Sequence, residues 1–406
     1  MLNVSVKSAL NPLHTSLFLV VLGICVSLHI WKLAPALPFL QIELQLDLVE
    51  AGFLLASVQI AGMSLGLLIG LFAERIGLRR CILIGLSILS LASVLATFFN
   101  AKLIMMLCRA LEGVGFLMVV LPGPALIKRM VPTDKLSRIM GWWGCYMPIG
   151  AVIILIVGAW FLSAYSWQAL WLILAAITAV LWLLALKLLP ADPDKSAASV
   201  APALAALSMV RTTLSAGRVW IVAVCFGMYA AQWSALIGFL PTIYADAHIA
   251  GPVAGLLTAL VAGANIIGNL SAGRLLHKGV PAAILLTVGL STMIVCAVVA
   301  FALGAPVSVQ FMAVFMFSAI GGLTPATLFM LAVTLAPTAQ TTASTVGWVQ
   351  QCSSLGQFAG PPVVGWVVYV LGGWQWAWVA TSAFALVGIG LVFTLRYTAP
   401  PALAQN

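Results

Sequence analysis

Residues 70–80 read GLFAERIGLRR, a short charged turn between two long apolar runs. The run before this turn covers about residues 50–74, and the run after it covers about residues 80–99. An apolar stretch of roughly 20 residues is long enough to cross a bilayer as an α-helix. The stretch therefore predicts a hairpin of two membrane-spanning helices.

The composition of the whole chain extends this prediction. Of its 406 residues, 63% are hydrophobic and only 7% are charged, whereas a soluble domain carries about 25% charged residues. The apolar runs are long and continuous rather than short and alternating, which favours an all-α membrane protein over a β-barrel. About twelve spans are predicted in this way, at residues 14–40, 50–74, 80–99, 102–127, 139–163, 167–189, 219–246, 251–274, 281–304, 306–334, 341–370 and 374–397.

The net charge of +9 is distributed as in a protein that crosses the membrane many times. Cytoplasmic loops of such proteins collect Lys and Arg. If the N-terminus is cytoplasmic, every basic residue except Lys32, Lys102 and Arg109 falls on that side, so both termini are predicted to be cytoplasmic. The chain has no basic tract of the kind that binds nucleic acid, so the lipid bilayer and not a nucleic acid is the expected partner.

The longest stretch without a predicted span is residues 190–218, which begins PADPDK. Proline and charged residues of this kind are typical of a linker, and the Ala- and Ser-rich part at 196–214 is compatible with a short surface helix. The predicted organisation is an N-terminal six-helix bundle (1–189), a cytoplasmic linker (190–218), and a C-terminal six-helix bundle with a short tail (219–406).

Short motifs recur in the same order in the two predicted halves. Any single match is weak, but four in register indicate a parallel duplication. Many transporters are built from such repeats and bind their substrates between them. The matches are Leu37-Pro38 with Leu240-Pro241, Gly70-x-x-x-Glu74-Arg75 with Gly273-x-x-x-His277-Lys278, Gly141-Trp142 and Gly150 with Gly347-Trp348 and Gly356, and Trp167-Gln168-x-x-Trp171 with Trp374-Gln375-x-x-Trp378.

Two motifs resemble signatures of the major facilitator superfamily. Residues 70–80 are similar to its G-x-x-x-D-R-x-G-R-[RK] loop between spans 2 and 3, with Glu74 in place of Asp and Leu78 in place of the first basic residue. Arg109-Ala-Leu-Glu112-Gly113-Val-Gly115 is similar to its R-x-x-x-G-x-G motif in span 4. The resemblance implies two pseudo-symmetric six-helix bundles and a charged cytoplasmic latch that ties them together in the outward-open state. The latch residues would be Gly70, Glu74, Arg75, Gly77, Arg79 and Arg80; the alternative is that these charges only orient the spans.

The resemblance also implies a function. We expect a secondary active transporter that works by alternating access in the bacterial inner membrane, as a monomer. A narrower resemblance to the cyanate/nitroimidazole-type branch rests on Trp31-Lys32-Leu-Ala-Pro35 and Phe239-Leu-Pro241, and it favours a small organic or inorganic anion as the substrate. The alternative is a proton-coupled exporter of drugs or of neutral or cationic metabolites. Symport and antiport both remain open.

Charged residues inside the membrane are costly and mark candidate functional sites. Lys32 in span 1 and Arg109 in span 4 are predicted to lie at similar depths, and Glu112 is on the same face of its helix as Arg109. Because spans 1, 4, 7 and 10 line the cavity in this superfamily, Lys32 and Arg109 are predicted to hold an anionic substrate. The alternatives are that Lys32 reaches the outer interface and that Arg109 and Glu112 only pair with each other.

Two further sets of residues complete the predicted site. Glu112 is the first candidate for carrying a coupling proton, and His29, which shares a helix face with Lys32, is the second. Simple packing between helices is the alternative for His29. Tyr229, Gln232 and Trp233, midway along span 7, are predicted substrate contacts, with ordinary helix packing as the alternative.

Other classes of protein lack support in the sequence. A membrane enzyme would need a nucleophile and base, or metal ligands, at membrane depth; the four His are scattered, and neither H-E-x-x-H nor G-x-S-x-G occurs. The seven Cys show no paired spacing, so no metal site is expected. The absence of a G-x-x-x-x-G-K-[ST] loop argues against ATP, and no cofactor is expected. A non-transporting sensor with the same fold remains an alternative that a flux assay would distinguish.

Overall fold

The computed structural model describes residues 12–99, 101–132, 139, 142–143, 145–192, 203–338 and 341–397, and all the secondary structure within them is helical. The helices of the first half are α1 (Pro12–Trp31), α2 (Leu33–Glu43), α3 (Leu48–Ala56), η1 (Ser57–Gln59), α4 (Ile60–Ile76), α5 (Leu78–Ala96), α6 (Lys102–Val120), α7 (Pro122–Met130), α9 (Tyr146–Ile153), η2 (Ile154–Gly158), α10 (Ala159–Leu162) and α11 (Trp167–Leu188). After α12 (Ala203–Ser215), those of the second half are α13 (Gly217–Asp246), α14 (Gly251–His277), α15 (Ala282–Ala297), η3 (Val298–Ala302), α16 (Val307–Gly321), α17 (Leu323–Thr334), α18 (Thr342–Leu371), η5 (Trp374–Trp376) and α19 (Ala377–Tyr397).

The predicted all-α membrane fold is confirmed. Within the described residues, eleven helical stretches are long and apolar enough to cross a membrane, and a shorter apolar helix, Tyr146–Leu162, lies where the remaining span is predicted. The prediction placed the start of that span at residue 139, in a stretch that the structure describes only in part.

Spans 1, 4 and 10 are interrupted close to a proline. The interruptions precede Pro35, Pro122 and Pro325, and in span 1 the residue between α1 and α2 is Lys32. Proline has no N–H to donate and its ring crowds the preceding turn, so a helix bends or breaks there. Lys32, a charged residue within an apolar span, therefore lies at the break between α1 and α2.

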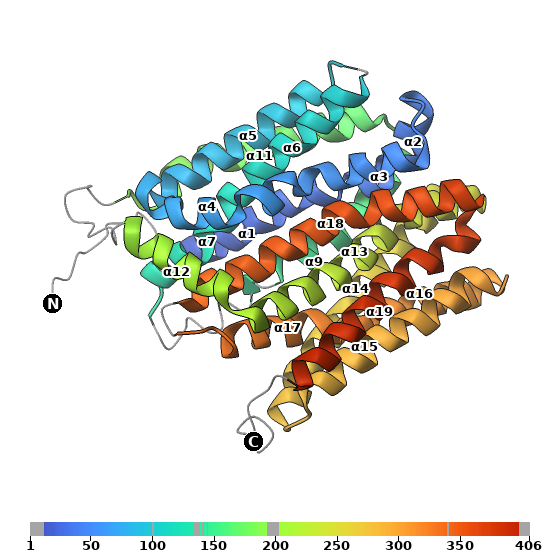
Figure 1. Cartoon of the computed structure of the whole chain (residues 1–406). Helices are drawn as coiled ribbons and strands as arrows, with labels where there is room; N and C mark the ends of the chain where they lie inside the picture. The colour runs from blue at the N-terminus through green and yellow to red at the C-terminus, as the bar shows by residue number, and fades with distance from the viewer. Residues whose placement is uncertain are drawn as a thin grey trace.

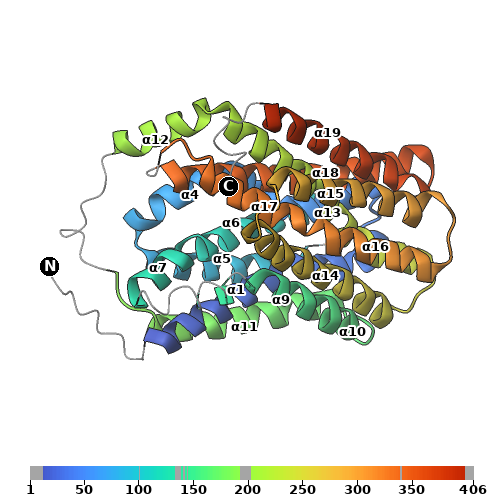
Figure 2. The ribbon, with the colours of Figure 1, turned by 90° about the horizontal axis from the view of Figure 1, so that it is seen from below.

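The two halves pack against each other along two seams. In Figure 1 the first half lies above the second, with α18 and α13 along the boundary. Helices α3 and α4 pack against α18, and α9, η2 and α10 pack against α14, which Figure 2 shows from below. Glycines permit the close approach, because a Cβ on Gly52 would collide with Pro361 and a Cβ on Gly255 would collide with Leu155.

The duplication is visible at the end of the molecule away from α12. In the first half the indole Nε1 of Trp167 donates to Glu43 Oε2 at 2.6 Å, and in the second half that of Trp374 donates to Asp246 Oδ2 at 2.8 Å. The offset of 203 residues that relates Leu37 to Leu240 also relates the two carboxylates. Each half thus fastens the end of its first span to the start of its last span in the same way.

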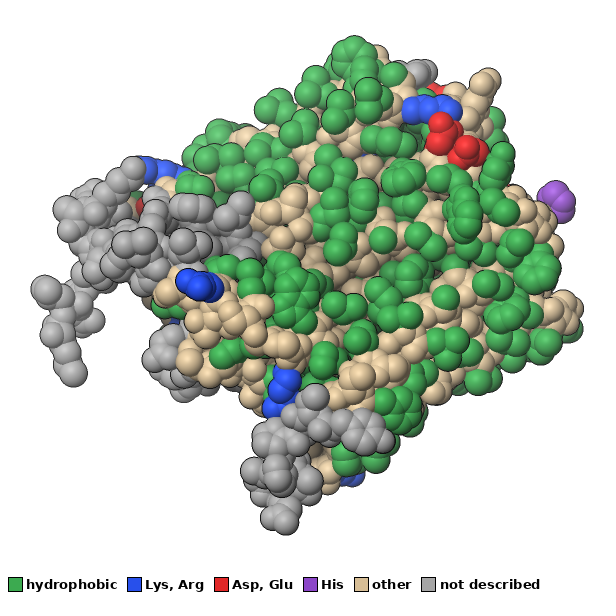
Figure 3. All heavy atoms as spheres, in the orientation of Figure 1, with side chains coloured by type: hydrophobic (Ala, Val, Ile, Leu, Met, Phe, Trp, Pro, Cys, Tyr) green, Lys and Arg blue, Asp and Glu red, His purple; other side chains and the backbone are tan. Residues whose placement is uncertain are grey.

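The surface agrees with a membrane setting. On the face shown in Figure 3, apolar side chains cover the middle and charged side chains lie toward the ends. Leu91, Leu270 and Leu386 are examples of large apolar side chains that are about 60% exposed on membrane-spanning helices. Such a surface is stable against lipid tails and not against water.

The linker contains the short helix that its composition suggested. Helix α12 lies at the same end of the bundle as α7, on the left in Figure 1. Thr213 Oγ1 and Ser344 Oγ are 2.6 Å apart, so a hydrogen bond ties α12 to α18. Residues 193–202 of the predicted linker lie outside the described residues, and the boundaries at 190 and 218 remain predictions.

Candidate functional site

Lys32 lies at the centre of a buried polar cluster inside the first half. Its Nζ is 2.5 Å from Glu112 Oε1, 2.5 Å from Ser93 Oγ and 3.3 Å from His29 Nδ1. The ammonium also lies 4.4 Å from the ring centroid of Trp171, within the range of a cation–π interaction. An ammonium has three N–H groups, so these three acceptors account for all of them.

Arg109 shares the same carboxylate. Its Nη1 donates to Glu112 Oε2 at 2.5 Å and to the backbone oxygen of His29 at 2.6 Å, while Nη2 donates to the backbone oxygen of Ile30 at 2.9 Å. The guanidinium therefore connects α6 to the last turn of α1, immediately before the joint at Lys32.

Hydrogen bonds indicate the protonation state of His29. Thr178 Oγ1 donates its single proton to the oxygen of Leu174 at 2.8 Å, so it accepts from His29 Nε2, which lies 2.8 Å away. His29 Nδ1 is then the acceptor for the Lys32 ammonium, which lies 3.3 Å away. This arrangement is that of a neutral imidazole with its proton on Nε2.

The cluster holds two cations and one carboxylate. Lys32 and Glu112 are fully buried and Arg109 is 1% exposed. With His29 neutral, one positive charge is left without a protein counter-ion in the cluster. A buried charge is expensive unless it is paired, so this surplus is the most distinctive electrostatic feature of the described chain.

The structure brings together four of the predicted residues: Lys32, Arg109, Glu112 and His29. The alternative in which Lys32 extends to the outer interface is wrong, since its side chain is 0% exposed and turns into the bundle. Arg109 and Glu112 do pair, at 2.5 Å, but Glu112 is equally close to Lys32, so the two do not pair only with each other. Their roles as substrate ligands or proton carriers remain proposals.

Sequence reasoning missed two members of the cluster, Ser93 and Thr178. Ser93 Oγ donates to Glu112 Oε1 at 2.7 Å and thereby brings α5 into the site. Both are small hydroxyl residues inside apolar helices, where such residues are common and carry no spacing signal. Only the position of their neighbours in space distinguishes them.

The second half has a polar cluster without charges. The amide Nδ2 of Asn265 donates to Tyr229 Oη at 2.8 Å and to the oxygen of Ser318 at 3.1 Å, and Trp233 Nε1 donates to Ser318 Oγ at 3.1 Å. Gln232 is fully buried on the same helix as the two aromatic residues. Tyr229 and Trp233 were predicted contacts, whereas Asn265 and Ser318 were not.

A small cavity lies between the halves. Its volume is about 30 Å³, which is room for about two water molecules. Trp31 and Trp233 meet beside it, edge to face, with ring centroids 5.5 Å apart. Neither Lys32 nor Arg109 lines it; its walls are Ile30, Trp31, Ala34, Leu55, Val58, Gln59, Ser234, Gly238, Gln357 and Pro361, all of them uncharged.

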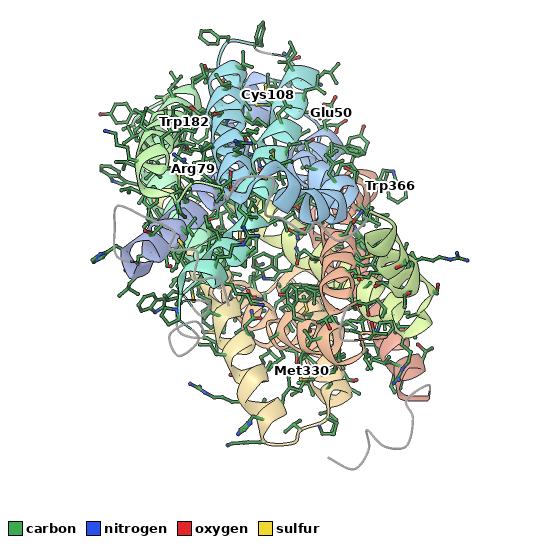
Figure 4. All side chains as sticks on the ribbon, turned by 90° about the vertical axis from the view of Figure 1, so that its left-hand side faces the viewer. Glu50, Arg79, Cys108, Trp182, Met330 and Trp366 are labelled. Atoms are coloured by element: carbon green, nitrogen blue, oxygen red, sulfur yellow. The ribbon has the colours of Figure 1, made fainter. Side chains whose placement is uncertain are left out.

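The predicted latch is described in part. Gly77 has φ +103°, a conformation that favours glycine, and a Cβ there would collide with the Asp192 carboxylate. That carboxylate accepts from the backbone N–H of Arg79 at 2.9 Å and of Arg80 at 3.1 Å. The guanidinium of Arg79, labelled in Figure 4, donates to the oxygen of Leu186 in α11.

The rest of the latch falls outside what the structure describes, namely the surroundings of Gly70 and the side chains of Glu74 and Arg75. Asp192 was noted in the sequence only as a linker residue. Its carboxylate in fact stabilises the first turn of α5, where the backbone N–H groups have no partner within the helix.

Comparison with known proteins decides the family. The model of the Major Facilitator Superfamily matches residues 19–344 and 222–406. The chain belongs to the major facilitator superfamily. The superfamily and the structural relatives below consist of transporters and not of enzymes.

Solved structures of other superfamily members share the fold. A bacterial homologue of the human lysosomal transporter Spinster, in an inward-facing and unoccupied conformation, aligns with a TM-score of 0.81 and 16% identity over 97% of this chain and 98% of that one. The nucleoside transporter NupG aligns with a TM-score of 0.75 and 16% identity, over 94% of this chain and 99% of NupG.

Two curated relatives match in sequence over a shorter region. They are the multidrug resistance protein B homologues of two Mycobacterium tuberculosis strains, each 29% identical over 130 residues, or 32% of this chain. The match spans 24% of each relative's length. These comparisons establish a multi-pass membrane transporter of this superfamily without defining its substrate.

Proposed function

We propose that the protein is a secondary active transporter of a small organic or inorganic anion, which works by alternating access and is coupled to protons. We place it in the bacterial inner membrane as a monomer, with both termini cytoplasmic because Lys and Arg are concentrated on that side. The narrower relationship to the cyanate/nitroimidazole-type branch is part of this proposal.

One observation carries the proposal: Lys32 and Arg109 share a single carboxylate, at 2.5 Å each. The cluster therefore has a surplus positive charge in a low-dielectric environment, where an incoming anion would neutralise it. A neutral or cationic substrate would gain nothing from this charge.

Glu112 is the proposed site of proton coupling. A proton on Glu112 would cancel the only carboxylate in the cluster and leave both cations free to bind a substrate anion. Proton and anion would then bind cooperatively, as symport requires. His29 is the weaker candidate, because a second proton on its Nδ1 would face the ammonium of Lys32.

The second half would contribute neutral contacts. Tyr229, Gln232 and Trp233 lie on α13, which faces α2 across the boundary between the halves. Aromatic and amide groups of this kind orient a bound molecule without competing for its charge. The anion would thus be held by the first half and positioned by the second.

The contacts between the halves suit alternating access. On the seam of α3 and α4 with α18, they extend from Gly52 at Pro361 to Gln351, whose Nε2 donates to the oxygen of Met63 at 2.6 Å. A Cβ placed on Gly66, nearer the α12 end, would meet no described atom within 4 Å. Rocking about such a seam would open the α12 end, and the loop at residues 70–80 would serve as the latch when that end closes.

An exporter of drugs or neutral metabolites is the second candidate. It is favoured by the uncharged walls of the cavity between the halves and by the partial match to a multidrug resistance homologue. Under this alternative the charged cluster would serve proton coupling alone.

The test is uptake by proteoliposomes of a panel of small anions, with and without an imposed pH gradient. We expect uptake of at least one anion class, stimulated when the proton gradient is directed inward. Absence of anion flux together with efflux of a neutral or cationic compound would favour the exporter. No flux of either kind would favour a non-transporting sensor.

A further inference from the structure

Trp31, which lines the cavity between the halves, has an unsatisfied donor that is buried in this conformation. Trp31 is 92% buried, since its exposure is 8%, and its indole Nε1 has no hydrogen-bond partner among the described residues. A buried N–H without a partner is destabilising, because it has lost its hydrogen bonds to water and gained none in the protein. Such a group calls for an explanation, and Trp31 lines the cavity.

The shape and chemistry of the walls narrow what would satisfy this donor. The walls are apolar except for Gln59, Gln357 and Ser234, and they include no charged residue. Trp31 meets Trp233 at 90°, an arrangement in which a further aromatic ring can join by stacking or edge contact. The preferred occupant is therefore a flat ring with a hydrogen-bond acceptor.

The size of the cavity depends on how the halves are placed. Its walls come from α1, α2, α3 and η1 of the first half and from α13 and α18 of the second. Gln59 Nε2 donates to Gln357 Oε1 at 3.0 Å from one half to the other. Separation of the halves would break this bond and release two amide groups. It would also widen a space that in this conformation has room only for water-sized molecules.

The cavity is also linked to the charged cluster. Trp31 directly precedes Lys32, so their Cα atoms are about 3.8 Å apart. Ile30 lines the cavity, and its backbone oxygen accepts from Arg109 Nη2 at 2.9 Å. A ring in the cavity would thus lie beside the backbone to which Arg109 is hydrogen-bonded. Trp31, which it would contact, is the neighbour of Lys32 in the chain.

We propose that this cavity, when the halves separate, is a subsite for the flat ring of the substrate, with Trp31 Nε1 donating to a ring acceptor. The inference rests on the proposed anion transport and narrows it. The substrate class is a small aromatic or heteroaromatic anion, with its ring at Trp31 and its charge toward Lys32.

The test is equilibrium binding of four radiolabelled probes to the purified protein in lipid nanodiscs at neutral pH. Benzoate and cyclohexanecarboxylate have the same charge and similar size and differ in aromaticity. Nicotinate adds a ring acceptor to benzoate, and nicotinamide removes the charge from nicotinate. The wild-type protein should bind nicotinate most tightly, then benzoate, then cyclohexanecarboxylate.

Trp31→Phe keeps a ring and removes the N–H, so the advantage of nicotinate over benzoate should fall by about two- to tenfold, the range of one net hydrogen bond. The preference for benzoate over cyclohexanecarboxylate should remain. The matched control is Trp366→Phe, whose indole is 57% exposed and lies at the periphery in Figure 4. That variant should retain the wild-type order of all four probes.

Two results would overturn the subsite. One is a wild-type protein that does not prefer benzoate to cyclohexanecarboxylate, a result that requires no variant to fold. The other is a folded Trp31→Phe variant with an unchanged ratio of nicotinate to benzoate affinity. If nicotinamide binds as tightly as nicotinate with the ring preference intact, the subsite is supported and the anion proposal fails; if only small inorganic anions bind, the anion proposal stands and the subsite fails.

Discussion

At the end away from α12, the two halves hold an indole against a carboxylate in the same way, Trp167 on Glu43 and Trp374 on Asp246. Their centres are different. The offset of 203 residues places Ala235 opposite Lys32, and the offset of 206 places Ser318 opposite Glu112. The first half thus has an ion cluster where the second has a methyl group and a hydroxyl.

This difference distinguishes contacts that support the fold from residues that serve the function. Contacts that recur in both halves support the duplicated scaffold, and their loss should affect both halves alike. Among the described residues, buried ions occur only in the first half, so the scaffold does not require them. Their surplus charge is a cost that a purely structural cluster would not need. The predictions below test this separation.

The largest expected effect is on stability when the shared carboxylate is removed. Glu112→Gln leaves two buried cations without a counter-ion and should lower the free energy of unfolding by about 3–5 kcal/mol. Lys32→Met should cost less, because Arg109 and Glu112 remain as a balanced pair. Thermal unfolding of the purified variants measures which substitution destabilises the protein more. Equal losses of stability, or a larger loss in Lys32→Met, would refute the surplus positive charge.

The matched change in the second half should be mild. Ser318→Ala removes the acceptor of Trp233 Nε1 and should cost about 0.5–1.5 kcal/mol, as one neutral hydrogen bond does. A loss as large as that of Glu112→Gln would mean that the two centres are structurally equivalent.

An effect of similar size is expected at the turn between spans 2 and 3. Asp192→Ala removes the acceptor for two N–H groups at the start of α5 and should cost about 0.5–2 kcal/mol, the range for a helix cap. Asp192→Asn keeps one acceptor and should cost less. Thermal unfolding of both variants measures these losses. An Asp192→Ala variant as stable as the wild type would show that Asp192 does not stabilise the turn.

The indole contacts should behave as a matched pair. Trp167→Phe and Trp374→Phe each remove one hydrogen bond to a partly solvated carboxylate and should each cost about 1 kcal/mol. Because they lie in different halves, their costs should add in the double variant. A large cost in only one half would contradict their shared role in the scaffold.

The topology prediction involves no loss of stability. Ser215→Cys on α12, in a background with Cys145→Ser because Cys145 is exposed, should react with a membrane-impermeant reagent only from the cytoplasmic side. Asp47→Cys, in the turn before α3, should react only from the other side. Labelling of α12 from outside would overturn the predicted cytoplasmic linker.

The fold could be predicted because it depends on signals that add along the chain. Apolar length and the placement of Lys and Arg agree along the chain, and four repeated motifs relate eight of the predicted spans. Depth along a helix and one-turn spacing also placed Lys32, Arg109 and Glu112 near one another. Each of these inferences uses distances within one helix, which the sequence gives directly.

What the sequence did not give is the direction of side chains between helices. Lys32 shares a span with the cavity-lining Trp31, yet it turns toward α5, α6 and α11, so the predicted cation is adjacent to the cavity and not in its wall. Ser93 and Asn265 were missed for the same reason. Their roles depend on which helices are neighbours in space.

The most direct test of the account is the affinity for a transported anion of Lys32→Ala, Lys32→Arg and Lys102→Ala. The last is a matched control, because Lys102 pairs with Glu50 at 2.7 Å and is 41% exposed. Loss of a charge-assisted hydrogen bond costs about 1.5–3 kcal/mol, so Lys32→Ala should weaken binding by roughly tenfold or more. Lys32→Arg should retain part of the affinity, since the charge survives while the donor geometry changes, and Lys102→Ala should match the wild type. Wild-type anion affinity in a folded Lys32→Ala variant would contradict the claim that the surplus charge of the first half binds the substrate.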